Sequence, residues 1–274
     1  MIEEIAAGIR AAARPIAVLA GSGVSQSAGV PTGQDLLRGL ARRRGEDAGP
    51  DPVTWYLGAL ETFPDYFGMV GDGTDALPDP IFDRPSTTPA HRAIGRMAAA
   101  GFVGPILTTN LDRLLERALR EAGVPFDIAY DLDALARIGL DGVVLLKLHG
   151  DYRDIGIRHT ARAAHSYHGV IDDLLDRVFA GFDLLVCGWS ASWDVPLRRA
   201  LRRAERERIW WLQCGPPSEA AQRIFAVRRP TVAAVEGSDE GLTELSALLL
   251  GTDRDARCGP PPGRAPDCGS VGHG

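Results

Sequence analysis

The chain has 274 residues, of which 45% are hydrophobic and 24% are charged, and its formal net charge at pH 7 is -6. A chain of this length and composition can bury a full hydrophobic core, so we expect one large globular domain, or one domain with an insert. The acidic balance argues against a surface built to bind nucleic acid.

The N-terminus and the cysteines indicate a cytoplasmic protein. Residues 1–14 lack the basic start and the uninterrupted apolar run of a secretory signal, and no segment has the length of a membrane span. The cysteines are far apart and form no C-x-x-C pair, which argues against a structural zinc site and for a reduced compartment. They are Cys187, Cys214, Cys258 and Cys268. We therefore expect no bound metal and no membrane contact.

Apolar runs and helical patterns alternate along most of the chain. Strands are predicted at residues 16–20, 104–109, 143–148, 183–187, 209–214 and 231–235. Helices are predicted at residues 2–13, 35–40, 89–100, 113–121, 170–180 and 195–208, with Thr88 as the N-cap of the third. This alternation predicts an α/β fold, a Rossmann-like doubly wound parallel sheet with helices on both faces.

Two stretches depart from this pattern. Residues 45–89 are rich in Gly, Pro and Asp and contain no long strand, which predicts a small, mainly helical insert beside the sheet. Residues 251–274 are Gly/Pro-rich and polar, which predicts a disordered tail. We therefore expect the folded domain to span residues 1–250.

A glycine turn at residues 20–31 joins the first predicted strand to the next helix. Gly21 and Gly23 have no Cβ, so the backbone can bend tightly and approach a ligand, while Ser25 and free backbone amides offer donors to an anion. A turn without a ligand is the alternative. The third glycine of the dehydrogenase fingerprint would fall at Gln26, so an ordinary nicotinamide dehydrogenase is not the preferred interpretation.

Polar motifs follow three further predicted strands. They are Thr-Thr-Asn-Leu-Asp at 108–112, Lys-Leu-His-Gly-Asp at 147–151 and Gly-Trp-Ser at 188–190. Ligands of doubly wound sheets bind beyond the carboxyl ends of the strands. We therefore expect these motifs and residues 21–25 to converge on one site.

In this order the four motifs resemble those of the sirtuin superfamily, and in particular its branch of sirtuin-like NAD hydrolases from prokaryotic defence systems. The resemblance spans roughly residues 14–236. It implies that residues 1–250 form a sirtuin-like catalytic domain that cleaves its substrate NAD to nicotinamide and ADP-ribose. It also implies that the protein is an antiphage effector that depletes NAD. Such an enzyme must be restrained in resting cells, so we expect a homo-oligomer or a regulatory protein partner.

The resemblance also implies roles for individual residues. Asn110 would lie beside the nicotinamide ribose, His149 would be the catalytic base, and Asp112 would support both. The residues expected to bind the rest of the NAD molecule are Ala20, Gly21, Ser22, Gly23, Val24, Ser25, Thr109, Gly188, Trp189 and Ser190.

The chemistry of NAD cleavage suits these side chains. Breaking the bond between ribose and nicotinamide develops positive charge on the sugar, which calls for a fixed, desolvated ribose and polar groups around it. A neutral imidazole accepts a proton near neutral pH, and an amide is both donor and acceptor. Each residue also has a structural alternative: Asn110 as a helix cap, Asp112 as a first-turn acid, and His149 as a hydrogen-bonded residue beside a turn at Gly150.

The chain departs from the protein deacylases of the superfamily at three places. Thr109 stands where they have glutamine, residues 32–35 lack their arginine, and the four-cysteine zinc module is missing. These departures favour hydrolysis over deacylation. The remaining alternatives are an NAD-dependent deacylase or ADP-ribosyl transferase, and a non-catalytic module that senses NAD or ADP-ribose.

Overall fold

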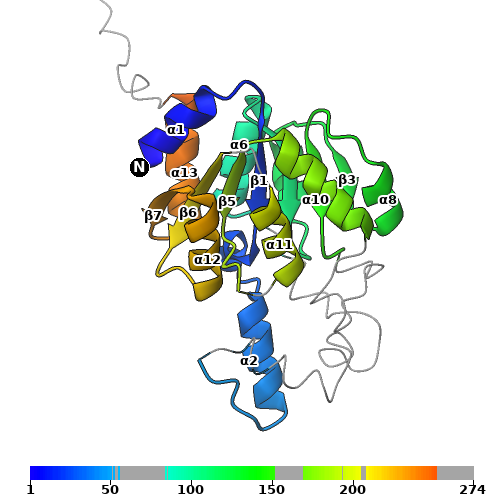
Figure 1. The fold of residues 1–274 in the computed structure, drawn as a ribbon, viewed down its shortest axis with the longest axis vertical. Helices are drawn as coiled ribbons and strands as arrows, with labels where there is room; N and C mark the ends of the chain where they lie inside the picture. Colours follow the sequence, from blue (N-terminus) through cyan, green and yellow to red (C-terminus); the bar gives the residue numbers. More distant parts are fainter. Residues whose placement is uncertain are drawn as a thin grey trace, which may run out of the picture.

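A computed structural model describes residues 1–50, 52, 55, 84, 86–151, 169–192, 194–204 and 208–251. Most of the insert predicted at residues 45–89 lies outside these ranges, as does the tail predicted at residues 251–274 from residue 252 onward. The described part contains a seven-stranded sheet with the order β3-β4-β2-β1-β5-β6-β7, and every neighbouring pair is parallel (Figure 1). This confirms the predicted α/β fold.

The described part has seven strands, and all but one of them lie within one residue of their predicted positions. They are β1 (Ile16–Ala20), β2 (Val103–Thr108), β3 (Asp127–Ala129), β4 (Val144–Lys147), β5 (Leu184–Cys187), β6 (Ile209–Cys214) and β7 (Thr231–Val235). Every residue of β1, β2, β4 and β5 is buried, which explains their continuous apolar runs. Strand β3 was not predicted, because its three residues at the edge of the sheet are too few to show a periodic pattern.

Helices cover both faces of the sheet (Figure 1). On one face lie α1 (Ile2–Arg10), α6 (Pro89–Ala99), α7 (Leu114–Glu121) and α13 (Ser238–Leu250). On the other lie α8 (Leu132–Arg137), α10 (Gly169–Gly181), α11 (Val195–Arg203) and α12 (Glu219–Arg228). Alternate side chains of β1 enter the two cores, with Val18 in the first and Leu19 in the second. The fold is therefore a three-layer sandwich.

The helices follow the predictions less closely than the strands. Helix α2 (Gly33–Arg43) is longer than predicted, and α8, α12 and α13 were not predicted. The helix predicted to reach Arg208 was too long: α11 ends at Arg203, and Ala204 is already extended. The carbonyl of Arg208 accepts a hydrogen bond from the Leu184 backbone at 2.8 Å, so this residue already pairs along the sheet and cannot continue a helix.

Side-chain caps fix where several helices begin. The hydroxyl of Thr88 accepts a hydrogen bond from the backbone N–H of His91 at 3.3 Å, which confirms Thr88 as the N-cap of α6. Asp131 and Asp194 cap α8 and α11 in the same way. A cap sets the direction in which the chain enters the helix, so each also places the residues before it.

The ends of the central strands stand level with one another. Ala20 at the end of β1 is paired with Thr108 of β2 and with Cys187 of β5, and Thr108 is paired with Lys147 of β4. From β1 the chain first builds the β2 side of the sheet and then returns to β5 on the other side, so the strand order reverses beside β1. The four predicted motifs therefore begin at one level around the switch point, where doubly wound sheets bind ligands.

None of the helices in the described ranges combines the length and the hydropathy needed to cross a membrane.

Candidate functional site

The two glycine-containing loops, which follow β1 and β5, touch through their backbones. The N–H of Gly21 donates to the Cys187 carbonyl at 3.0 Å, and the N–H of Gly23 donates to the Gly188 carbonyl at 2.9 Å. A Cβ on Gly21 would lie 2.5 Å from the Gly188 oxygen, and one on Gly23 would lie 2.8 Å from the Gly188 Cα. Gly188 itself has a φ of 62°, in the left-handed region. These glycines are thus required for the two loops to meet.

The residues predicted to bind NAD differ in exposure. Ser22, Gly23, Thr109 and Gly188 are half-buried and Ser190 is exposed, whereas the others are buried. The buried ones are Ala20, Gly21, Val24, Ser25 and Trp189. The ring of Trp189 packs against Trp211, with centroids 5.7 Å apart. The outer members of the predicted set are therefore Ser22, Gly23, Thr109, Gly188 and Ser190.

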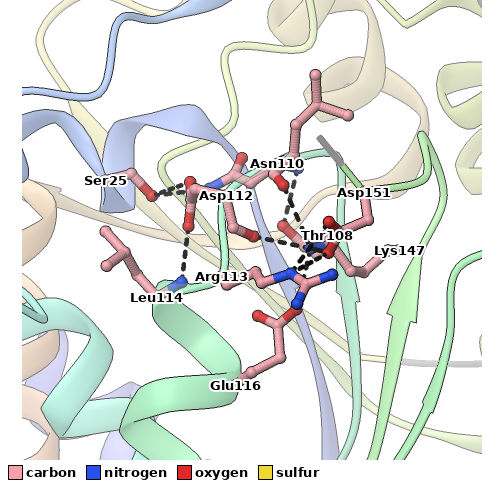
Figure 2. Close-up of polar contacts among 10 residues, drawn as sticks. Ser25, Thr108, Asn110, Asp112, Arg113, Leu114, Glu116, Lys147 and Asp151 are labelled. Atoms are coloured by element: carbon pink, nitrogen blue, oxygen red, sulfur yellow. Dashed lines mark hydrogen bonds and ion pairs between the residues drawn. The ribbon is translucent and has the colours of Figure 1, made fainter. Parts of the chain in front are cut away.

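Asn110 is held at the end of β2 in one orientation (Figure 2). Asn110 is 5% exposed, and its Nδ2 donates to the Ser25 hydroxyl at 3.0 Å and to the Gly21 carbonyl at 3.3 Å. Gly21 offers only a carbonyl acceptor there, so the amide nitrogen must face it. Within the described residues the Asn110 Oδ1 is buried and has no hydrogen-bond partner. A buried acceptor without a partner is rare in native proteins and indicates a place for a donor from water or a ligand.

A chain of buried hydrogen bonds fixes Ser25, which contacts Asn110. The backbone N–H of Thr88 donates to the His91 Nδ1 at 3.3 Å, so the proton of the neutral ring is on Nε2, which contacts the Ser25 oxygen at 3.3 Å. The Ser25 hydroxyl then donates its single proton to the Asp112 Oδ2 at 2.8 Å. The Ser25 hydroxyl thus makes its hydrogen bonds to buried protein groups, and these bonds orient Asn110 and Asp112.

Asp112 lies just before α7, whose N-cap is Arg113 and whose first-turn acid is Glu116, so it is not itself the first-turn acid of that helix. It is 4% exposed, and its Oδ1 accepts a hydrogen bond from the Leu114 backbone at 3.0 Å at the start of α7. Its Oδ2 faces Ser25 instead. Asn110, by contrast, does not cap α7, whose N-cap position is Arg113. A buried carboxylate therefore lies one hydrogen bond away from the hydroxyl that orients Asn110.

Lys147, the last residue of β4, holds the loop that carries these residues. Its Nζ is completely buried and donates to the carbonyls of Leu111 at 3.3 Å and Asp112 at 2.8 Å. The same ammonium contacts Glu116 at 3.0 Å and Asp151 at 2.7 Å (Figure 2). One cation therefore links β4, the loop after β2, the first turn of α7 and the end of the third motif.

The carboxylates around Lys147 are in different surroundings. Asp151 also accepts from the Arg113 Nε at 2.9 and 3.0 Å, so it faces two cations. Burial raises the pKa of Glu116 even though Lys147 opposes this effect. Asp151 is thus the better compensated partner of the buried ammonium.

His149 lies two residues beyond Lys147, as Asn110 lies two residues beyond the paired Thr108. Its Nε2 is 2.8 Å from the Oδ2 of Asp194, and the histidine side chain is 12% exposed. The turn proposed beside it is present, since the Gly150 N–H donates to the Lys147 carbonyl at 3.1 Å and Gly150 has a φ of 79°. His149 is therefore a partly exposed imidazole fixed by a buried carboxylate.

The sequence interpretation missed four residues that support the site. Lys147 and Asp151 belong to a predicted motif but received no role, and His91, within the helix predicted at residues 89–100, received none either. Asp194 gave a detectable signal, because Asp followed by Val-Pro is typical of a helix N-terminus, but nothing in the sequence connects it to His149. Within the described residues there is no group of three or more metal-ligating side chains.

The pKa of His91 leads to a prediction about stability. Burial lowers this pKa below its usual value of 6.5, and nearby Asp112 offsets the effect only in part. The unfolded chain therefore binds a proton at His91 more readily than the folded one. The stability that folding gains from keeping His91 neutral is fully present above about pH 6.5. It is lost as the pH falls towards the pKa of His91 in the folded protein.

We expect the free energy of unfolding, measured in urea at pH 7.5, 6.5 and 5.5, to fall more steeply in the wild type than in His91→Gln. The difference in slope should approach, at most, about 1.4 kcal/mol per pH unit, the limit for one proton. Equal slopes in the two proteins would contradict the buried neutral state of His91.

Comparisons with known proteins agree with this architecture. Residues 105–228, which include Asn110, His149 and Ser190, match the family described as the SIR2-like domain. A stretch of 142 residues is 29% identical to the NAD(+) hydrolase ThsA of Bacillus cereus (strain MSX-D12). The match covers 49% of this chain and 28% of that protein, so the chain corresponds to much less than the whole relative.

A solved structure from work on the mechanism and regulation of Sir2 enzymes superposes with a TM-score of 0.52 at 16% sequence identity. The superposition covers 91% of this chain and 97% of the other. At this identity the likeness concerns the fold. Residues 105–228 are thus similar to a SIR2-like domain, and the described fold is similar to that of a Sir2 enzyme.

Proposed function

We propose that this protein is an NAD hydrolase that cleaves NAD to nicotinamide and ADP-ribose. The observation that carries the proposal is the buried Oδ1 of Asn110, an acceptor held at a strand end with no hydrogen-bond partner in the described part of the chain. The proposal is supported by the partial match to an NAD(+) hydrolase. It is also supported by the pairing of the strand ends, which starts the four motifs at the same edge of the sheet.

In the proposed reaction Asn110 accepts a hydrogen bond from a ribose hydroxyl or from the attacking water. The glycosidic bond breaks and its electron pair moves to the nicotinamide nitrogen, which becomes neutral. The water oxygen bonds to the anomeric carbon, and its proton passes to His149 and then to solvent. Buried Asp112 favours the positive charge that develops on the sugar. The residues predicted to hold the rest of NAD are Ala20, Gly21, Ser22, Gly23, Val24, Ser25, Thr109, Gly188, Trp189 and Ser190.

We further propose that the reaction takes place in the cytoplasm and is restrained by self-association or by a protein partner. Both cysteines in the described ranges, Cys187 and Cys214, are free thiols, which suits a reducing compartment. Burial raises the pKa of Cys187 to about 12, so this thiol stays protonated and has a packing role.

Incubating the purified chain with NAD, with and without an acetylated peptide, tests the activity. We expect nicotinamide and ADP-ribose to appear in equal amounts, as separated by chromatography, without any need for the peptide. If nicotinamide appeared only with the peptide, the enzyme would be a transferase or deacylase. If NAD were bound but left intact in every oligomeric state, a sensing module would be the better description.

Substituting Asn110 tests the group that carries the proposal. We expect Asn110→Ala to lower kcat by about 10²- to 10³-fold, because it removes an oriented acceptor at the reacting sugar. Gln213→Ala is the matched control, since Gln213 also lies near the end of a strand and, within the described residues, its amide nitrogen donates to the nearby carbonyls of Cys214 and Gly215 alone. Near-native turnover in Asn110→Ala, with both variants folded by circular dichroism, would contradict the assignment.

The proposed biological role is the depletion of NAD during phage infection, which is implied by the resemblance to defence-system hydrolases. In infected cells that express the wild-type chain we expect NAD to fall, and in cells that express Asn110→Ala we expect it to stay at the uninfected level. A constant NAD concentration in infected wild-type cells would argue against this role while leaving the activity measured in vitro unaffected.

A further inference from the structure

Asp194 connects His149 to the start of a packed helix. This aspartate is 3% exposed and is the N-cap of α11, where its Oδ1 accepts a hydrogen bond from the Leu197 backbone at 3.0 Å. Its other oxygen, Oδ2, lies 2.8 Å from the His149 Nε2. The two oxygens of one carboxylate thus face two different groups, a helix end and an imidazole.

The helix that holds Asp194 is firmly packed. Leu197 and Leu201 of α11 are at most 1% exposed and belong to one of the two cores. At the other end of the helix, Arg203 forms ion pairs with Asp172 at 3.0 Å and Asp176 at 2.8 Å, both on α10. The position of the carboxylate is therefore set by the packing of α11, and the carboxylate in turn sets the position of the imidazole.

An ionised carboxylate only accepts hydrogen bonds, so the His149 Nε2 must carry the proton that lies between the two groups. The neutral ring then has its lone pair on Nδ1. When the ring gains a proton and becomes an imidazolium, the buried carboxylate stabilises the charge. In serine hydrolases a buried aspartate likewise fixes the tautomer and orientation of the histidine, although there it binds Nδ1 and leaves Nε2 as the base.

We infer that Asp194 is a positioning residue for His149: it holds the imidazole in the Nε2–H tautomer, so that Nδ1 is the atom that takes the proton in the reaction. This inference rests on the proposed function for its catalytic meaning. The tautomer itself depends only on the geometry of the two side chains.

The simpler interpretation is that Asp194 serves only as a helix cap. Asp131 provides the comparison, because its Oδ1 accepts from the Ala134 backbone at 2.7 Å at the start of α8. Asparagine caps helices about as well as aspartate, so Asp→Asn preserves the cap at either position. Only at position 194 does the substitution also remove the charged acceptor of a histidine proton.

The experiment compares Asp194→Asn, the control Asp131→Asn, His149→Ala and the double variant Asp194→Asn/His149→Ala. We expect Asp194→Asn to lower kcat by about 10²- to 10⁴-fold with little change in KM, the range typical of a lost or wrongly protonated base. Asp131→Asn should retain wild-type kcat. The double variant should be no slower than His149→Ala, because Asp194 acts through the histidine.

Nitrogen-15 NMR of labelled histidine gives a readout independent of turnover. We expect the neutral His149 ring to carry its proton on Nε2 in the wild type and to shift towards the Nδ1–H form in Asp194→Asn. An unchanged tautomer, or a kcat of Asp194→Asn within threefold of Asp131→Asn, would overturn the inference. If the wild type left NAD intact, the proposed function would fail, and the NMR comparison would still decide whether Asp194 sets the tautomer.

Discussion

The site depends on the buried ammonium of Lys147. It supplies hydrogen bonds to two backbone carbonyls of the loop after β2 and to two carboxylates, at distances between 2.7 and 3.3 Å. Removing one partner from a buried ion pair leaves an uncompensated charge and typically costs about 3–5 kcal/mol. The buried ammonium therefore fixes the backbone of the loop that carries Asn110. This explains how an irregular segment beyond a strand can have a defined conformation.

Around this centre the polar groups form an inner and an outer set. The inner set, which includes Ser25, His91 and Asp112, is buried and linked by hydrogen bonds with a consistent donor direction. The outer set, which includes Thr109, His149 and Ser190, reaches the surface. Asn110 lies between the inner and outer sets. Its side-chain nitrogen donates to buried groups, and its side-chain oxygen has no hydrogen-bond partner in the described residues. Rigid support behind an unsatisfied acceptor is the arrangement that a preorganised site requires.

The central sheet was predictable because its signals are local. Apolar runs fully buried between two helical layers identify β1, β2, β4 and β5, and Thr88 marks the start of α6. The prediction was weaker where a local pattern does not set the boundary. The three residues of β3 depend on pairing with β4, and the end of α11 depends on the backbone of Arg208 joining the sheet beside Leu184.

By itself the sequence determined which residue types stand at the strand ends, and therefore that Asn110, Asp112 and His149 share one edge of a parallel sheet. Only the tertiary structure decided how their hydrogen bonds run. His91 meets Ser25 across 66 residues and Asp194 meets His149 across 45, because α6 and α11 pack on opposite faces of the sheet and bring their first turns to the same edge. A hydrogen bond needs its two atoms within about 3 Å and correctly aligned. That condition depends on helix packing, which the spacing of residues along the chain does not specify.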